Sequence, residues 1–135
     1  MRAYGPTVLR VFLGVVFVMH AYLALVIYTP AGSAAFNAKI GVPLPAVAAW
    51  FTIFAHGLGG IMLIIGLWTR WAALANAVVM LGALVFAHLN QGFFIKAVLV
   101  DGKPQAAGYE YVLTLVGAAI AQALLGSGAL ALKRD

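Results

Sequence analysis

Four long apolar segments, separated by short polar stretches, run through this chain at about residues 8–28, 46–67, 71–89 and 108–125. Each is close to the roughly 20 apolar residues that, at 1.5 Å rise per residue, cross a ~30 Å hydrocarbon layer. Trp50 and Trp71 lie at the two ends of the stretch 50–71, where amphipathic rings favour the headgroup boundary. The pattern predicts one all-α domain over residues 1–135, an integral membrane four-helix bundle.

The segments between the spans carry turn-forming residues. Residues 29–45 contain three prolines and are expected to be a loop, with Pro43 and Pro45 at the entrance of the second helix because proline lacks an amide donor. In the 93–107 connection, Asp101-Gly102 is expected to turn a small hairpin. Within the second span, Gly57, Gly59, Gly60 and Gly66 would let other helices approach closely.

The basic residues indicate an orientation. With four spans, both termini lie on one side, which receives five basic residues, namely Arg2, Arg10, Arg70, Lys133 and Arg134. Arg10 is counted here as preceding the first span. The opposite side receives Lys39, Lys96 and Lys103. By the positive-inside rule, both termini are expected to be cytoplasmic, in a multi-pass protein of the bacterial inner membrane.

Composition narrows the function classes. The chain is 65% hydrophobic and only 8% charged, whereas soluble domains carry about 25% charged residues, so most of its surface must face lipid or protein. The eight Lys and Arg form no stripe, which argues against nucleic-acid binding and for contact with lipid headgroups. The absence of cysteine excludes disulfide, thiolate-metal and Cys-x-x-Cys redox chemistry within this chain.

Each predicted helix carries one ionisable residue at membrane depth. These are His20, His56, His88 and Glu110. On a count of 1.5 Å per residue, His20 lies about 12 Å and His56 about 16 Å below the outer boundary, whereas His88 and Glu110 lie within a turn of it. Ionisable side chains at such depth are costly and usually face the bundle interior. All four are therefore candidate site residues, in the outer half of the bundle.

Helical spacing suggests which residues share a face. One stripe on the second span joins Thr52, His56, Gly60 and Leu63, and one on the fourth joins Glu110, Thr114, Gly117 and Ala121. Both stripes are small and polar, as membrane helix contacts tend to be. The nearest pair in depth is His88 with Glu110. Asn76 and Gln122 are expected to form hydrogen bonds between helices, and each histidine also fits a packing role.

The chemistry of these residues favours a quinone over a metal. A metal needs ligand atoms about 2 Å from one point, but His56 and His88 differ by most of half a membrane in depth. Haem between His20 and His56 is disfavoured because no CxxCH motif and no arginine for the propionates accompany them. An apolar site with a few hydrogen-bonding groups suits a quinone, and we expect no covalently bound cofactor.

The chain resembles the DoxX family of small four-span membrane proteins, which is related to the DoxD subunit of thiosulfate:quinone oxidoreductase. The resemblance extends over nearly the whole chain. It rests on Leu9-Arg10 with His20, Gly59-Gly60 through Gly66-Leu67-Trp68-Thr69-Arg70, Ala87-His88-Leu89 through Gly92-Phe93-Phe94, Gly108-Tyr109-Glu110-Tyr111, and Leu124-Leu125-Gly126-Ser127-Gly128. It implies a DoxX-like transmembrane domain near membrane redox enzymes.

Three functions stay open at this point, and so does the question whether the chain is an enzyme. The leading hypothesis is an accessory or quinone-associated subunit of a membrane redox complex, in which His20, His56, His88 and Glu110 contact a quinone or relay protons. The second is a structural membrane anchor or assembly partner. The third is a small transporter, which four short spans without interrupted helices favour less. The expected partners are membrane lipid and other membrane or redox-complex subunits.

Overall fold

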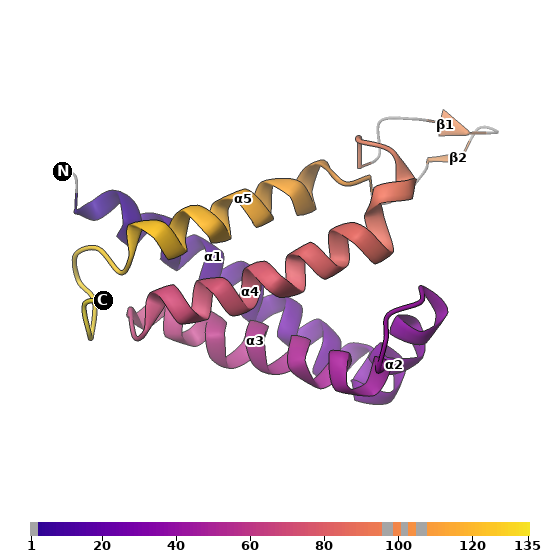
Figure 1. Cartoon of the computed structure of the whole chain (residues 1–135), viewed down its shortest axis with the longest axis horizontal. Coiled ribbons are helices and arrows are strands. Elements are labelled where there is room, and N and C mark those ends of the chain that lie inside the picture. The colour runs from indigo at the N-terminus through magenta and orange to yellow at the C-terminus, as the bar shows by residue number, and fades with distance from the viewer. Residues whose placement is uncertain (1–2, 96–98, 101–102, 105–107) are drawn as a thin grey trace.

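A computed structural model describes residues 3–95, 99–100, 103–104 and 108–135 of the chain. Four helices run lengthwise through the molecule (Figure 1), and a shorter one lies at one end. Their bounds are α1 Tyr4–Tyr22, α2 Thr29–Lys39, α3 Pro45–Ile65, α4 Thr69–Ala83 and α5 Glu110–Leu125. The π-helical segment η1 (Leu23–Ile27) continues α1. The π-helical segment η2 (Leu84–His88) and the 3₁₀ segment η3 (Leu89–Gln91) continue α4.

The long helices form a bundle in which sequence neighbours pack against each other. α1 lies along α3, α3 packs on α4, and α4 packs on α5. Both ends of the chain lie at one end of the bundle, here called the terminal end. The opposite end, with α2 and the connection between η3 and α5, is called the loop end. α1 and α5 lie close in the half nearest the terminal end and diverge toward the loop end (Figure 1).

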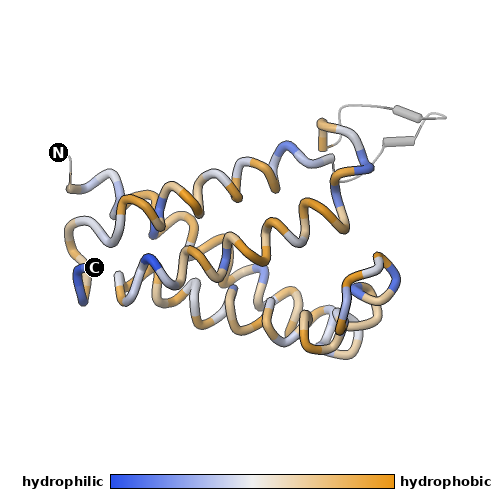
Figure 2. Tube along the Cα trace, viewed as in Figure 1, coloured by the Kyte–Doolittle hydropathy of each residue, from blue (hydrophilic) through white to orange (hydrophobic). Residues whose placement is uncertain are grey.

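Three of these helical stretches are long and apolar enough to cross a membrane. They are Tyr4–Ile27, Pro45–Ile65 and Thr69–Gln91, and Glu110–Leu125 is a shorter apolar helix. With 16 residues, α5 is about 24 Å long at 1.5 Å per residue, somewhat less than a hydrocarbon layer. Figure 2 shows apolar residues along all four helices. The predicted helical membrane bundle is confirmed.

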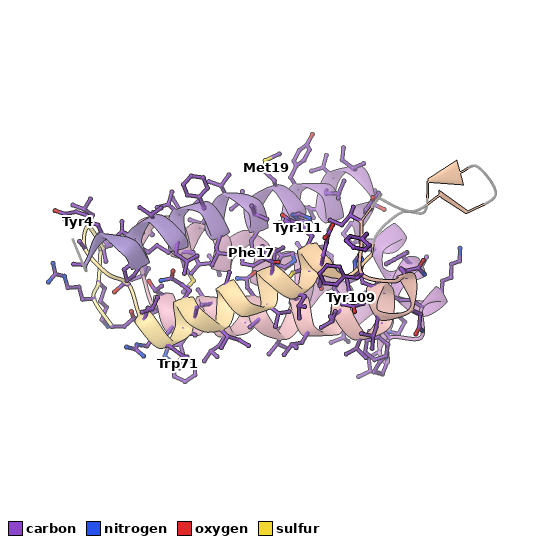
Figure 3. All side chains as sticks on the ribbon, turned by 90° about the horizontal axis from the view of Figure 1, so that it is seen from above. Tyr4, Phe17, Met19, Trp71, Tyr109 and Tyr111 are labelled. Atoms are coloured by element: carbon purple, nitrogen blue, oxygen red, sulfur yellow. The ribbon has the colours of Figure 1, made fainter. Side chains whose placement is uncertain are left out.

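The bundle hides small residues and exposes large ones. Its core contains alanines from α4 and α5 together with Leu13, Phe17 and Leu63. Large apolar side chains such as Phe12, Phe54 and Trp71 are 60–73% exposed, and the stick view shows side chains of this kind projecting outward (Figure 3). In water such a surface would be an aggregation hazard, whereas in a bilayer it faces lipid. The distribution follows from helices that approach closely through small residues.

The expectation of a loop over residues 29–45 is wrong for its first two thirds. Thr29–Lys39 forms α2, which packs on α3. Pro30 does not prevent this because it occupies the first turn, where an amide donor has no helical partner. Pro45 is the first residue of α3, as predicted. The amide Nδ2 of Asn37 donates to the carbonyl of Pro45 at 3.2 Å and ties α2 to the start of α3.

A two-residue antiparallel ladder lies in the connection before α5. Strand β1 (Leu99–Val100) pairs with β2 (Lys103–Pro104), and Leu99 faces Pro104 in the register. This pairing agrees with the hairpin expected there. The predicted turn, Asp101-Gly102, lies outside the described residues.

Glycine allows α1 and α3 to approach at one crossing. A Cβ atom added to Gly14 would lie 2.6 Å from the carbonyl oxygen of Gly60, and one added to Gly60 would lie 3.0 Å from the carbonyl oxygen of Gly14. Both values are below ordinary van der Waals distance, and the atoms in the way belong to backbone. The close helix approach that the glycines of the second span predicted is therefore made at Gly60.

At the terminal end, Arg10 is buried and holds two parts of the chain together. The expectation that Arg10 precedes the first span is wrong, because it lies within the apolar stretch Tyr4–Ile27 and is 1% exposed. Its guanidinium donates to carbonyls at the C-terminal end of α3 and in the tail after α5. The acceptors are Leu63 (2.9 Å), Ile64, Ser127 (2.9 Å), Ala129 (3.3 Å) and Leu130 (2.7 Å).

Helix geometry explains why an arginine fits there. The last carbonyls of a helix lack amide partners and carry the negative end of the helix dipole. A guanidinium supplies five N–H donors in a rigid fork, so one side chain can satisfy carbonyls from both segments. Gly66 leaves the space that this requires, because a Cβ there would lie 2.9 Å from Cζ of Arg10 and 2.7 Å from Ala131. The tail also pairs its backbone with Ala3 and Ile65.

Replacing Gly14 or Gly60 by alanine should destabilise the bundle by about 1–3 kcal/mol, because the added methyl group overpacks the α1–α3 crossing. The measurement is thermal unfolding in lipid nanodiscs. Gly117→Ala is the matched control, since a Cβ at Gly117 would meet no atom within 4 Å. Equal stability of all three variants would show that this crossing is not close-packed.

Arg10→Met should lower the free energy of unfolding by roughly 3 kcal/mol or more, because several buried carbonyls lose charged donors at once. Arg134→Met, at an exposed arginine, is the control and should cost little. Deleting residues 127–135 removes the other half of the interaction. The combined variant should then cost clearly less than the sum of the two changes. Strict additivity would contradict the coupling between Arg10 and the tail.

Candidate functional site

The four predicted site residues come from four helical stretches, as the sequence suggested. His20 is in α1, His56 in α3, His88 at the end of η2, and Glu110 is the first residue of α5. The structure brings two of them together. The ring centroids of His20 and His56 lie 6.1 Å apart with an interplanar angle of 71°.

His56 is held at the centre of the bundle by three helices. It is 4% exposed, and its ring stacks on Phe17 with centroids 4.9 Å apart and an interplanar angle of 11°. Its Nδ1 lies 2.7 Å from Oδ1 of Asn76 on α4. Figure 3 shows Phe17 pointing into the bundle, whereas Met19 points away from it. The imidazole is therefore fixed by contacts to both α1 and α4.

Asn76 determines which nitrogen of His56 carries the proton. Its amide Nδ2 donates to the carbonyls of Ala55 and Ala72, both at 2.8 Å. The reverse amide orientation would place Oδ1 against these two acceptors, so the oxygen must face His56. Since Oδ1 only accepts, Nδ1 of His56 must donate. Gly59 makes room for this arrangement, because a Cβ there would lie 2.9 Å from Nδ2 of Asn76.

The helix that contains His20 fixes the tautomer of this residue as well, again with the proton on Nδ1. Nδ1 of His20 lies 2.8 Å from the carbonyl oxygen of Val16, which accepts, so Nδ1 is the donor. His20 is exposed at the protein surface. In the part of the chain that the structure describes, Nε2 of neither histidine has a hydrogen-bond partner. In neutral imidazoles with these tautomers, both Nε2 atoms present lone pairs, which accept hydrogen bonds or bind metals.

The histidine pair lies next to the start of a π-helical segment. The π-helical segment η1 begins at Leu23, three residues after His20, and π segments in helices are frequent at functional sites. His20 is exposed on a helix of the bundle, so a molecule dissolved in the bilayer can reach it laterally.

His88 and Glu110 belong to a different level of the bundle. His88 follows Asn76 by twelve residues in α4 and η2, which is about 18 Å along a helix. The Oε1 atom of Glu110 accepts a hydrogen bond from the backbone amide of Ile95 at 3.1 Å, which holds the connection against the start of α5. Direct pairing of His88 with Glu110 stays a prediction.

Two surface depressions lie away from the histidine pair. One, of about 370 Å³, lies beside Glu110 and includes Phe93 and Thr114; the other, of about 400 Å³, lies between the end of η1 and α2. Neither is lined by His20 or His56. A ligand of the histidine pair would thus bind against the lipid-facing surface and not inside an enclosed slot.

The two imidazoles do not by themselves make a metal centre of the common kind. Catalytic zinc sites use three protein ligands and structural sites four. Among the described residues, no group of three or more His, Asp or Glu side chains could hold a metal ion. The donor set fits a small hydrogen-bonding ligand better.

Other polar residues behave partly as the sequence suggested. Asn76 joins α3 to α4, which confirms its predicted role between helices. Gln122 instead donates to the carbonyl of Gly126 at 2.6 Å and caps its own helix. The stripe of Thr52, His56, Gly60 and Leu63 faces inward, but in the fourth span Thr114 and Gly117 are exposed and the buried face carries Leu115 and Ala119.

Sequence reasoning missed Phe17 and Arg10. Phe17 lies three residues before His20, so helical spacing placed it on the same side of α1, but an apolar residue in an apolar span gives no chemical signal. In the sequence, the charge of Arg10 indicates only topology, although its position seven residues before Phe17 places it on the same helical face.

Asn76→Leu should free the tautomer of His56 and lower the free energy of unfolding by about 1–3 kcal/mol, because Nδ1 loses its buried acceptor. The measurement is ¹⁵N NMR of histidine-labelled protein, with His56→Gln to assign the signal. In the unmodified protein, His56 should be protonated at Nδ1. Asn90→Leu, at an exposed asparagine, should leave the signal unchanged. A proton on Nε2 in the unmodified protein would contradict the hydrogen-bond assignment.

Comparison with known proteins identifies the family. The model of the DoxX family matches residues 5–89, which contain α1 to η2 and all three histidines. The match ends before Glu110 and the C-terminal tail, so it covers less of the chain than the resemblance noted from the sequence. No curated protein and no solved structure matches the chain. Because the match extends over more than half of its length, this multi-pass membrane protein belongs to the DoxX family.

Proposed function

We propose that the chain binds the headgroup of a quinone, in its oxidised or reduced form, at His20 and His56, and that it serves as a quinone-associated subunit of a membrane redox complex. The bacterial inner membrane is the proposed location. In this role the protein supplies hydrogen bonds and a binding face, while the quinone supplies the electron chemistry.

The observation that carries the proposal is the pair of imidazoles with unpartnered Nε2 atoms. One ring is exposed and the other is nearly buried, and their centroids are 6.1 Å apart. Small-molecule sites combine apolar surface with a few fixed polar groups. Phe17, stacked on His56, supplies apolar aromatic surface beside the polar atoms.

The position of the pair suits a ligand that lives in the bilayer. His20 and His56 lie within stretches long and apolar enough to span a membrane, so a quinone would not need to leave the lipid to reach them. Nearer the loop end, His88 and Glu110 are proposed to relay protons between this level and the aqueous boundary.

Direct binding tests the proposal. The chain in lipid nanodiscs should bind decylubiquinone or its hydroquinone in excess of empty nanodiscs of the same lipid. His20→Leu should weaken binding about three- to tenfold, the loss expected for one hydrogen bond. His20 is suited to this test because it is exposed and its hydrogen bond is to its own helix, so the variant should fold.

Met19→Leu is the matched control, since Met19 is adjacent and 59% exposed. It should bind like the unmodified protein. If neither redox form binds to the folded chain, or if His20→Leu binds equally well, the quinone site is wrong.

An assembly partner without a ligand is the second candidate, and the outer face of α5 favours it. Thr114 and Gly117 are exposed there, and a Cβ at Gly117 would meet nothing within 4 Å. Small residues on an exposed membrane helix permit close approach of another helix. The subunit role requires such a contact as well. The two candidate functions therefore differ only in whether the histidine pair binds a ligand.

Purification from the native membrane in mild detergent tests the subunit role itself. Stoichiometric recovery with redox subunits would support it. Recovery of the chain alone or as a homo-oligomer would contradict it and leave only the quinone site to be assessed. Gly117→Leu should release the partner if α5 is the contact, whereas Gly82→Leu, at another open glycine, should not.

A further inference from the structure

We propose that the site formed by His20 and His56 selects the hydroquinone form over the quinone form. This inference rests on the proposed function, and it concerns which redox state the site recognises. It follows from the direction of the hydrogen bonds that the two rings already make.

Both Nδ1 atoms are occupied as donors. His20 donates to the carbonyl of Val16, and His56 donates to Oδ1 of Asn76. Val16 offers only a backbone carbonyl at that position, and the Asn76 amide is locked by its bonds to Ala55 and Ala72. Neither acceptor can turn into a donor. Consequently, a neutral imidazole at either position keeps its proton on Nδ1 and offers a lone pair at Nε2.

The described surroundings of the two rings supply no counter-charge. Their hydrogen bonds and ring contacts are to the Val16 carbonyl, the Asn76 amide, the Phe17 ring and each other. A charge at membrane depth requires a partner of opposite charge or access to water. In their neutral form, both imidazoles are acceptors at Nε2.

Quinones and hydroquinones differ in whether their two oxygens can donate hydrogen bonds, and a site that offers only acceptors distinguishes them. The two oxygens of a quinone are carbonyls, which only accept hydrogen bonds, so they would meet the Nε2 lone pairs without a proton between them. The two oxygens of a hydroquinone are hydroxyls, which can donate. A buried acceptor that faces another acceptor loses a hydrogen bond and its solvation. The reduced form is thus the better match.

The expected discrimination is about tenfold, because the free-energy difference of one hydrogen bond is near the 1.4 kcal/mol that corresponds to a factor of ten. Tighter binding of the reduced form raises the midpoint potential of the bound couple. For a two-electron couple, a tenfold preference corresponds to about 30 mV.

The test compares the affinities of decylubiquinone and its hydroquinone for the full chain in nanodiscs under anaerobic conditions. Empty nanodiscs correct for partitioning into lipid. Hydroquinone should bind about tenfold more tightly. His20→Gln introduces an amide that both donates and accepts, so it should lower the ratio to the preference that His56 alone retains. His20→Arg introduces donors only and should lower the ratio further than His20→Gln does, whereas Met19→Ala should leave the ratio unchanged.

Equal affinity for the two forms, or tighter binding of the quinone by the unmodified chain, would overturn the selectivity and leave the quinone site intact. Binding of neither form would overturn the proposed function together with the selectivity. In ¹⁵N NMR, hydroquinone should shift the Nε2 signals of His20 and His56 while both Nδ1 atoms stay protonated. A shift of the proton to Nε2 would also contradict the inference.

Discussion

A hydrocarbon layer offers no water to polar groups, so a donor or acceptor inside this bundle is costly unless it finds a partner in the protein. Two networks meet this constraint. At the terminal end, Arg10 supplies donors to the last carbonyls of α3 and to the tail after α5. At mid-bundle, Asn76 supplies donors to two carbonyls and accepts from His56. Each network links segments distant in the sequence through one polar side chain.

The lack of water also determines which nitrogen of each histidine carries the proton and which presents a lone pair. In water, an imidazole exchanges its proton between two nitrogens, and solvent satisfies either one. Here, fixed acceptors hold the proton on Nδ1 of both rings, so the free nitrogens have a defined polarity. A site with defined polarity distinguishes molecules of the same shape that differ in donors and acceptors, and redox forms of a quinone are such molecules.

The helices that carry the histidines lie almost entirely within the residues that match the family, whereas α5 lies outside them. Residues 5–89 include nearly all of α1, together with α3, α4 and the histidines, and these helices carry the candidate site. α5 lies outside the match and presents small residues on its exposed face. A short helix with an open face is suited to contact between subunits, whereas the closely packed pair α1 and α3 is suited to holding fixed side chains.

The sequence alone determined the membrane bundle and the candidates within it. Long apolar segments give spans because length and hydropathy are local properties. Four ionisable residues stood out because charge at membrane depth is rare, and the glycines of the second span indicated close approach. The interhelical role of Asn76 was also predicted. The family followed from short motifs around these residues.

Only the tertiary structure decided which of these residues meet. His56 and Asn76 are twenty residues apart on different helices, and no local pattern specifies the rotation and register that join them. Rotation also reversed the expectation for α5, whose small stripe faces outward. Arg10 looked like a topology signal because its partners, backbone carbonyls, carry no sequence signature. A backbone acceptor is available at every residue, so only the folded chain selects the ones that a side chain reaches.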